Sequence, residues 1–437
     1  MTDEICKPPT IFERHRARRL AIWNGAIWAV GNGLASTTLV IYLAGELHAE
    51  QFGLGIGLIL ASPHVAGLLQ LGAPAMIGRL ARRKRFCLTA FFLSALLLSA
   101  LPYLCSPGRL PSAGWSLAAM ISLWCLYHVL QYLGMVALWA WLADVAPTRI
   151  RGRYFGRRQR WIVAGTAAAA LAAGFFVWGC HACWPDAPRW IPYGLMAELG
   201  VCFMLAALAP MALMPACVGQ IKHIATQYNN AAHWATPFQD GRFLRLLLFG
   251  CLFSLVNGVT QSAQNYYPLH ILRVSLFVSL AIQTGMNLGQ CGVSPWLGRA
   301  ADRLGNRPVM FACQLLVAAG MLYYAVATPH QWWWIVGAWI FWIAYAGLNV
   351  CLPNLTLKLA SPGAAASYTA AFQAAGGFCY AVGSIFGGAL VDRFASGGRV
   401  WLLFFPCLFV FGWFARSLAA MLILWIVEPR KTRKDIL

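Results

Sequence analysis

The sequence predicts an all-α membrane protein with twelve transmembrane helices arranged as two parallel six-helix repeats. Of its 437 residues, 60% are hydrophobic and only 11% are charged, which is too apolar for a soluble protein of this size. Apolar runs of about 20 residues, the length that crosses a bilayer, recur along the chain. The net charge of +20 is spread over short segments between these runs, so the membrane explains it better than nucleic acid does.

Twelve apolar runs are separated by charged or turn-forming residues. The first six spans are expected at residues 20–45, 52–77, 86–105, 113–142, 161–180 and 191–214. The second six are expected at residues 243–268, 274–298, 308–327, 332–357, 364–390 and 400–427. Residues 215–242 are rich in Gln, Asn, His and Thr, which suits a cytoplasmic linker. The chain is therefore expected to form an N-terminal bundle (1–214), this linker and a C-terminal bundle (243–437).

Short sequences recur at equivalent places in the two halves. The loop Gly78–Arg85, after the second span, occupies the place that Gly298–Arg307 occupies after the eighth. A Tyr followed five residues later by a Gln occurs after the fourth span and again after the tenth, beginning at Tyr154 and Tyr368. This repetition predicts that the two halves are parallel six-helix repeats.

Lys and Arg are unevenly distributed between the two sides of the predicted spans. Of the 33, 27 fall on the side of the N-terminus and five fall on the other side. Because these residues are enriched on the cytoplasmic side of membrane proteins, both termini are expected to face the cytoplasm. The short loops favour a multi-pass protein of a bacterial inner membrane.

Two loops resemble signatures of a known family. The loop Gly298–Arg307 reads G-R-A-A-D-R-L-G-N-R and resembles the major facilitator superfamily signature G-x-L-A-D-R-x-G-R-R/K. The segment from Asp144 to Arg153 resembles the family's D/E-x-x-P-x-x-x-R-G loop. The resemblance covers nearly the whole chain and implies a secondary transporter, in which two bundles alternately expose a central site. It also implies that spans one, four, seven and ten line that site.

The same resemblance implies a gate on the cytoplasmic side. Its members would be Asp144, Arg151, Asp302, Arg303 and Arg307. Asp302 is expected to face a helix N-terminus, where the backbone dipole favours negative charge. In the first half the signature's Asp is replaced by Arg82, so a latch of this kind rests on Asp302 alone.

Polar side chains recur at helical spacing on single faces of several spans. The candidate solute contacts are Asn24, Trp28 and Asn32 in span one, His128 and Gln131 in span four, Asn257, Gln261 and Asn265 in span seven, Gln283 and Asn287 in span eight, and Asn349 in span ten. A transporter needs polar groups at mid-membrane, where an amide without a partner is costly. Each amide could instead join two helices, so the set carries more weight than any member.

The chemistry of these positions favours a neutral, hydroxyl-rich solute such as a sugar. Amides both donate and accept hydrogen bonds, and Trp and Tyr faces pack against the apolar side of a sugar ring. Two alternatives stay open: multidrug efflux on the same fold, since the spans are rich in aromatic residues, and a non-transporting membrane receptor. We expect no enzyme activity, cofactor or metal, and a monomer whose partners are the solute and the lipid bilayer.

Candidates for proton coupling, in symport or antiport, are few. Glu198 in span six is the clearest intramembrane carboxylate, and His128 is a second candidate. If neither titrates, facilitated diffusion is the simpler mechanism. Arg416 in span twelve could snorkel, pair internally or bind an anion. Cys180 and Cys183, in C-H-A-C, are expected to be unpaired thiols, with a bridge or a metal pair as the weaker alternative.

Overall fold

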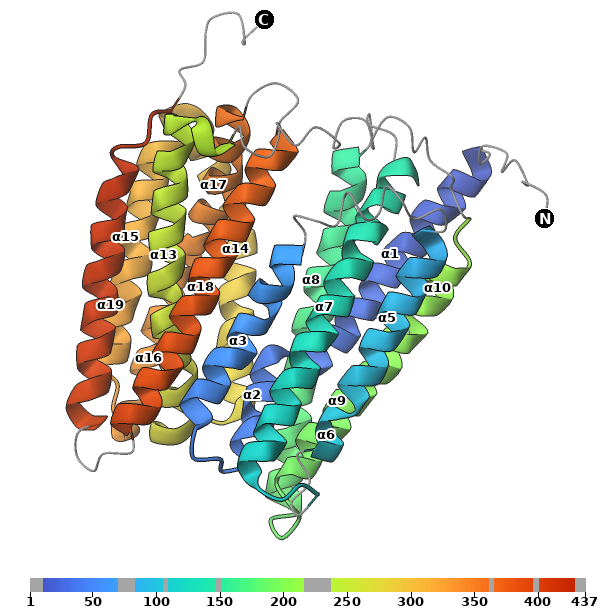
Figure 1. Cartoon of the computed structure of the whole chain (residues 1–437), viewed down its shortest axis with the longest axis vertical. Coiled ribbons are helices and arrows are strands. Elements are labelled where there is room, and N and C mark those ends of the chain that lie inside the picture. The colour runs from blue at the N-terminus through green and yellow to red at the C-terminus, as the bar shows by residue number, and fades with distance from the viewer. Residues whose placement is uncertain are drawn as a thin grey trace, which may run out of the picture. The chain divides into compact units, whose positions relative to one another are not determined.

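The computed structural model describes residues 11–69, 83–104, 109–145, 151–215, 237–360, 365–395 and 401–428, and within these ranges every regular element is a helix (Figure 1). The all-α fold class is therefore confirmed. The chain divides into two compact units. Unit 1 comprises residues 1–50, 69–230 and 276–280, and unit 2 comprises residues 51–68, 231–275 and 281–437.

Unit 1 is a bundle of helices from the first half of the chain. Its helices are α1 (Ile11–Leu34), α2 (Thr37–Gly45), α5 (Arg83–Ser99), α6 (Leu101–Leu104), α7 (Ala113–Val145), α8 (Arg151–Cys183), α9 (Trp190–Ala206) and α10 (Leu208–Ala212). The first turn of α14 (Leu276–Leu304) also belongs to this unit.

Unit 2 contains the rest of α14 and the helices of the second half, together with one helix from the first half. These are α3 (Phe52–Leu68), α13 (Gly241–Tyr266), α15 (Asn306–Val326), α16 (Trp334–Phe341), α17 (Tyr345–Leu359), α18 (Ala365–Ala395) and α19 (Trp401–Ile423). A π-helical turn, Tyr267–Ile271, extends α13, and a 3-10 turn, Trp342–Ala344, joins α16 to α17.

Ten described segments are long and apolar enough to cross a membrane. They correspond to ten of the twelve predicted spans. The other two predicted spans coincide with α3, which is apolar but has 17 residues, and with α14, whose apolar run is interrupted by Gln283, Asn287 and Gln290. The multi-pass architecture is confirmed, while the count of twelve stays a prediction.

The first predicted span is broken where the sequence offers a cap. Ser36 has an extended backbone, and its Oγ accepts a hydrogen bond from the N–H of Leu39 at 3.3 Å. This is the geometry of a helix N-cap, so α2 begins anew at Thr37 instead of continuing α1. Asp240 begins α13 in the same way by accepting from the N–H of Arg242 at 2.9 Å.

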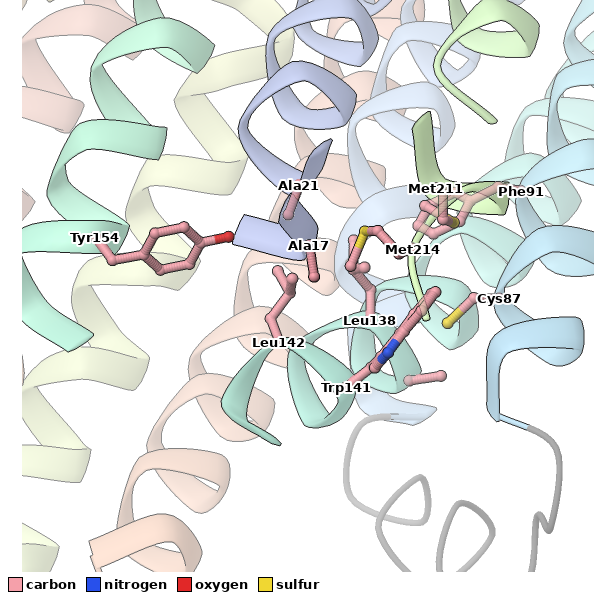
Figure 2. Packing of buried hydrophobic residues seen from close by; sticks show 11 residues of the cluster. Ala17, Ala21, Cys87, Phe91, Leu138, Trp141, Leu142, Tyr154, Met211 and Met214 are labelled. Carbon is pink, nitrogen blue, oxygen red and sulfur yellow. The ribbon is translucent and has the colours of Figure 1, made fainter. Parts of the chain in front are cut away.

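Helices in unit 1 approach closely through small residues. A Cβ at Gly31 of α1 would lie 2.6 Å from the carbonyl oxygen of Gly200 in α9. At one end of this bundle, buried side chains from α1, α5, α7, α8 and α10 form an apolar core (Figure 2). The largest of them, Trp141, is buried, and its indole N–H donates to the carbonyl of Pro215 at 3.2 Å. Close contacts between small residues thus hold the helices together along the bundle, and the apolar core around Trp141 holds them together at this end.

In unit 2, α18 packs against both α3 and α13. Ser384 of α18 donates to the carbonyl of Gly57 in α3 at 3.1 Å, and its own carbonyl accepts from Ser262 of α13 at 2.8 Å. The close approach depends on glycine, because a Cβ at Gly388 would strike the backbone of Gly53. Although α3 lies in the first half of the sequence, its packing therefore belongs to unit 2.

The N-terminus of α3 is capped by a residue from a distant part of the chain. Asp392, in the last turn of α18, accepts hydrogen bonds from the N–H groups of Gly53 at 2.6 Å and Leu54 at 2.7 Å. The local position before the helix holds Gln51, which is not a favourable N-cap residue. A carboxylate from α18 therefore replaces the local cap and also meets the positive end of the helix dipole.

Candidate functional site

Three of the predicted solute contacts line up along α13. Asn257 accepts a hydrogen bond through Oδ1 from the hydroxyl of Tyr345 at 3.1 Å, which joins α13 to α17. Asn265 donates through Nδ2 to the carbonyl of Gln261 in its own helix at 2.9 Å. All four side chains are partly exposed. The Gln261 amide makes no hydrogen bond within the described residues, so it is free to contact a solute.

Aromatic residues of the same unit lie near this polar face. The rings of His64 in α3 and Tyr380 in α18 are 4.1 Å apart between centroids. Tyr380 and Tyr345 both lie near the guanidinium of Arg416 in α19. We call Asn257, Gln261, Tyr345, Tyr380 and His64 the polar cluster of unit 2. It combines amides, hydroxyls and aromatic rings, the set that recognises neutral polar molecules.

Arg416 lies fully buried next to this cluster. Its Nη2 donates to Oγ1 of Thr260 at 2.7 Å, and the same oxygen accepts from Nε2 of Gln264 at 3.1 Å. Gln314 of α15 donates to the Arg416 carbonyl at 3.2 Å. The Nε and Nη1 atoms of Arg416 have no hydrogen-bond partner within the described residues. Arg416 therefore does not snorkel to the surface, and internal pairing satisfies only part of its guanidinium.

The predicted solute contacts of spans eight and ten differ in their burial. Gln283 is half-buried, whereas Asn287 and Asn349 are exposed. Gln290, farther along α14 than Asn287, donates through Nε2 to the carbonyl of Trp342 at 3.2 Å. This bond ties α14 to the turn before α17, so Gln290 is a structural amide.

In unit 1, two of the predicted amides bond within the bundle. Asn24 is buried and donates to the carbonyl of Ala207 at 2.9 Å, which joins α1 to the segment before α10. Gln131 donates to the hydroxyl of Tyr127 one turn earlier in α7 at 2.9 Å. For Asn24 the interhelical alternative therefore holds in this structure.

Two more predicted solute contacts of unit 1 are His128, which packs against an aromatic ring, and Trp28, which lines a cavity. The ring of His128 meets the ring of Trp124 edge-on at 4.6 Å between centroids. Trp28 and Asn24 line a cavity of about 190 Å³ together with Arg158. Asn32, farther along α1, is partly exposed. The structure does not bring the unit 1 residues into one continuous polar face.

The proton-coupling candidate Glu198 lies in α9. It is partly buried, and its Oε1 is enclosed without a hydrogen-bond partner among the described residues. The two cysteines that drew attention in the sequence, Cys180 and Cys183, are free thiols in the structure.

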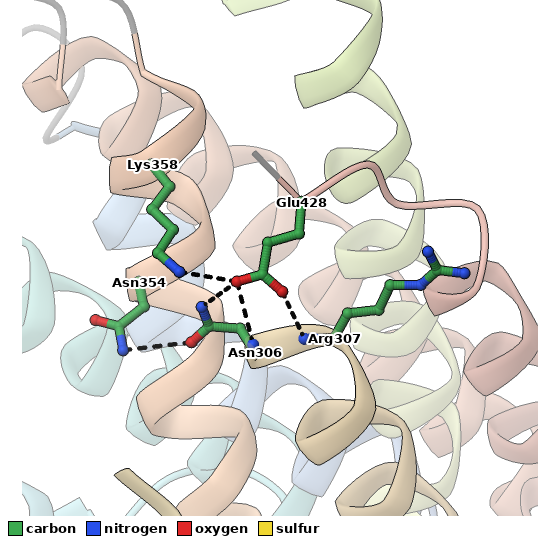
Figure 3. A network of polar contacts seen from close by, with 5 residues as sticks. All are labelled: Asn306, Arg307, Asn354, Lys358 and Glu428. Carbon is green, nitrogen blue, oxygen red and sulfur yellow. Dashed lines mark hydrogen bonds and ion pairs between the residues drawn. The ribbon is translucent and has the colours of Figure 1, made fainter. Parts of the chain in front are cut away.

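A polar cluster at the start of α15 surrounds the carboxylate of Glu428 (Figure 3). Its Oε1 accepts from the backbone N–H of Asn306 at 3.2 Å, from Nδ2 of Asn306 at 2.7 Å and from Nζ of Lys358 at 2.8 Å. Its Oε2 accepts from the N–H of Arg307 at 3.1 Å. Asn354 adds a longer bond to Asn306 at 3.5 Å. We call this the Glu428 cluster.

The Glu428 cluster joins three elements at one end of unit 2. Glu428 follows α19, Lys358 is in the last turn of α17, and Arg307 is in the first turn of α15. The Arg307 guanidinium also donates to the carbonyl of Leu424. Burial raises the pKa of Glu428, but the hydrogen bonds it accepts outweigh this effect and lower the pKa to about 2.

The other predicted gate residues make fewer contacts than Arg307 or lie outside the described residues. Asp302 and Arg303 are exposed at the end of α14, and no hydrogen bond or ion pair reaches Asp302 within the described residues. Gly305 has a φ of 96°, so the glycine of the loop signature makes the turn between α14 and α15. The side chains of Asp144 and Arg151 lie outside the described residues. Their gating role stays a prediction.

Comparison with known proteins bears on this arrangement. Residues 246–436 match the family model described as Major Facilitator Superfamily. Nearly the whole chain superposes on solved transporters of the same fold. A D-xylose-proton symporter has a TM-score of 0.64 at 17% identity, covering 96% of this chain and 98% of that chain. The second half of the chain therefore matches the major facilitator superfamily, and the chain as a whole has the fold of these transporters.

Other solved transporters fit about equally well. The nucleoside transporter NupG has a TM-score of 0.61 at 15% identity, covering 93% of this chain and 98% of that chain. A POT family transporter, solved with a thioalcohol-conjugated peptide, has a TM-score of 0.67 at 12% identity, covering 94% and 96%. At these identities the likeness concerns the fold alone. A comparison with curated protein sequences finds no match.

The sequence did not reveal the partners of three charged residues. Glu428 and Asp392 lie at the ends of apolar runs, where a carboxylate is unremarkable. For Arg416 the sequence leaves three roles open, and it could not show that Thr260 would bond to the guanidinium and to Gln264. In each case the sequence shows a charged residue at the end of a span or inside it. It does not show which helix that residue would contact.

Proposed function

We propose that this chain is a major facilitator transporter, which moves a small neutral polar solute, of the sugar or nucleoside type, across the membrane by alternating access. The observation that carries the solute class is the polar cluster of unit 2. It presents the half-buried amide of Gln261 beside the hydrogen-bonded pair of Asn257 and Tyr345. The helices that supply these groups, α13 and α17, contain no Asp or Glu. The names of the xylose and nucleoside transporters that share the fold accord with this class.

A thermal-shift screen of the purified protein in detergent tests the solute class. Sugars, nucleosides, organic acids and cationic drugs are added separately, since a ligand that binds the native state raises the melting temperature by mass action. We expect stabilisation by one neutral polar class. Stabilisation by several unrelated lipophilic compounds would instead support multidrug efflux.

A second candidate is a solute that carries a carboxylate. It is favoured by Arg416, because a buried guanidinium with two unpaired nitrogens is electrostatically costly without a counter-charge. In the same screen this candidate predicts stabilisation by organic acids and not by neutral sugars. An Arg416→Gln variant would then lose the response to acids.

The remaining mechanistic assignments belong to the same proposal. The cytoplasmic gate is formed by the loop of Asp302 and Arg303, with the Glu428 cluster holding the adjacent end of α15. Both termini lie in the cytoplasm, and the protein works as a monomer in the inner membrane. Coupling to protons, if present, uses Glu198 or His128. Uptake into proteoliposomes with and without a proton gradient tests coupling, and Glu198→Gln should abolish the difference if Glu198 carries the proton.

A further inference from the structure

A groove of about 450 Å³ lies between α1 and α8 of unit 1. Its lining includes three basic side chains, His15, Arg19 and Arg157, and two large aromatic ones, Trp23 and Trp161. Both Trp side chains are open to the surroundings, with 60% and 55% of their surface exposed. None of the described residues that line the groove is acidic. Its lining is therefore basic at some positions and apolar at the others.

The packing of α1 against α8 separates these two characters along the groove. The helices run parallel, because Arg158 bonds to the carbonyl of Ala21 at 3.3 Å and Thr166, farther along α8, bonds to Ala29, farther along α1, at 3.2 Å. Their basic N-terminal ends therefore lie at the same level. Trp161 follows Arg157 by one turn, as Trp23 follows Arg19. The basic side chains form one end of the groove and the indoles form the other.

Neighbouring arginines of α8 have different environments. Arg158 is buried, lies against Gly25 and donates into the bundle, so its charge is used inside unit 1. Arg157 is exposed and has no hydrogen bond or ion pair within the described residues. Exposed arginines beside tryptophans at the end of a membrane span are at the level of the lipid headgroups. Arg157 and Arg19 are therefore placed for an anion that comes from the membrane.

We propose that this groove is a binding site for an anionic phospholipid. The phosphate lies between the guanidinium groups of Arg19 and Arg157, with His15 beside them, and an acyl chain runs along Trp23 and Trp161. Guanidinium groups bind phosphate by paired, charge-assisted hydrogen bonds. Basic pockets between transmembrane helices are suited to acidic headgroups, and the indoles supply the apolar contact that a free anion would not use. The site is separate from the polar cluster of unit 2 and does not depend on the transported solute.

The test measures lipid binding to the full-length protein purified in detergent. Dioleoylphosphatidylglycerol is titrated against dioleoylphosphatidylcholine, with binding read by native mass spectrometry and by the shift in melting temperature. We expect phosphatidylglycerol to bind and stabilise, and phosphatidylcholine to do so far less. Equal effects of the two lipids would overturn the proposal. Inorganic phosphate is a third probe, and stabilisation by phosphate as large as that by the lipid would show a soluble-anion site instead.

Variants locate the site. Arg19→Gln with Arg157→Gln removes two phosphate contacts, so the affinity for phosphatidylglycerol should fall roughly thirty-fold. Arg16→Gln with Arg160→Gln removes the same charge from exposed positions on the same two helices that do not line the groove. This control should retain the affinity. If both double variants lost the same affinity, net charge alone would explain the effect and the site would be refuted.

A second pair of variants covers the case in which the first does not fold. Replacing Arg19 and Arg157 by Lys keeps the charge and should keep most of the selectivity for the anionic lipid. Trp161→Ala should weaken lipid binding while leaving any response to inorganic phosphate unchanged. Undiminished lipid binding by Trp161→Ala would contradict the placement of the acyl chain.

Discussion

Replacing Glu428 by Gln should destabilise unit 2 without altering its apolar packing. The carboxylate accepts four hydrogen bonds, two of them from the first backbone N–H groups of α15. It therefore caps that helix as well as pairing with Lys358. A glutamine of nearly the same shape keeps one acceptor oxygen and loses the charge and the other acceptor.

The size of the effect follows from two independent considerations. The pKa of Glu428 is about 2 instead of the ordinary 4.5, and at about 1.4 kcal/mol per pH unit this difference corresponds to about 3 kcal/mol. The Glu428 side chain is 16% exposed and Lys358 is 34% exposed, so solvent screening reduces this value. Losing a helix cap costs about 1 kcal/mol, and an exposed ion pair is worth at most about 1 kcal/mol. We expect a loss of about 2 kcal/mol.

The pH dependence gives this prediction a distinct signature. Because the folded-state pKa is depressed, the carboxylate's contribution is fully present above about pH 4.5 and is lost as the pH falls toward 2. Melting temperatures of the wild type and Glu428→Gln in detergent should therefore differ by a constant amount between pH 8 and pH 5. The difference should shrink below pH 4.5, because the wild type loses stability there and the variant does not.

The matched control is Asp302→Asn, which removes a carboxylate at the other end of the same turn. Asp302 is exposed and receives no hydrogen bond within the described residues, so this change should leave the melting temperature as it is. A Glu428→Gln variant as stable as the wild type at pH 7, or a larger loss in Asp302→Asn, would refute the assignment of the cap to Glu428.

Three further changes test the candidate site and its supports. Tyr345→Phe removes the hydroxyl that holds Asn257, so solute affinity in the thermal-shift assay should fall several-fold while the melting temperature without solute changes little; unchanged affinity would remove the pair from the site. Asp392→Asn should lower the stability of the protein by about 1 kcal/mol, since α3 loses part of its cap, and an unchanged melting temperature would contradict that role. Asp302→Asn should slow transport in proteoliposomes and leave solute affinity intact, and a normal rate would exclude it from the gate.

The helices of this protein could be predicted because a bilayer leaves the backbone few choices. A chain in hydrocarbon must satisfy its N–H and C=O groups internally, so each apolar run of sufficient length is a helix. The runs read from the sequence coincide with helices wherever the structure describes them. The breaks at Ser36 and at Trp342–Ala344 were not predicted, since they depend on local capping and packing and do not interrupt the apolar run.

The polar residues were harder to interpret, because a stripe of amides identifies a helix face and does not identify its neighbour. Asn24 and Gln261 occupy similar stripes in the first and seventh spans. In the structure, Asn24 is buried against the carbonyl of Ala207, whereas Gln261 is half-buried with no partner among the described residues. Likewise, the loop signature predicts that Asp302 faces a helix N-terminus. In the structure, the carboxylate that caps α15 comes instead from Glu428, more than a hundred residues away.

The cap on α3 links this packing to the proposed mechanism. In chain order α3 lies in the first half of the sequence, yet its N-terminus is held by Asp392 of the second half through two short hydrogen bonds. A Cβ at Gly53 would lie 2.7 Å from Oδ1 of Asp392, so glycine is what lets the carboxylate approach. If α3 separates from α18 at this end during alternating access, both bonds must break and water must replace the carboxylate at the helix end. Under the proposed mechanism Asp392 would then favour the state in which these bonds are made, and Asp392→Asn should shift the population toward the other state.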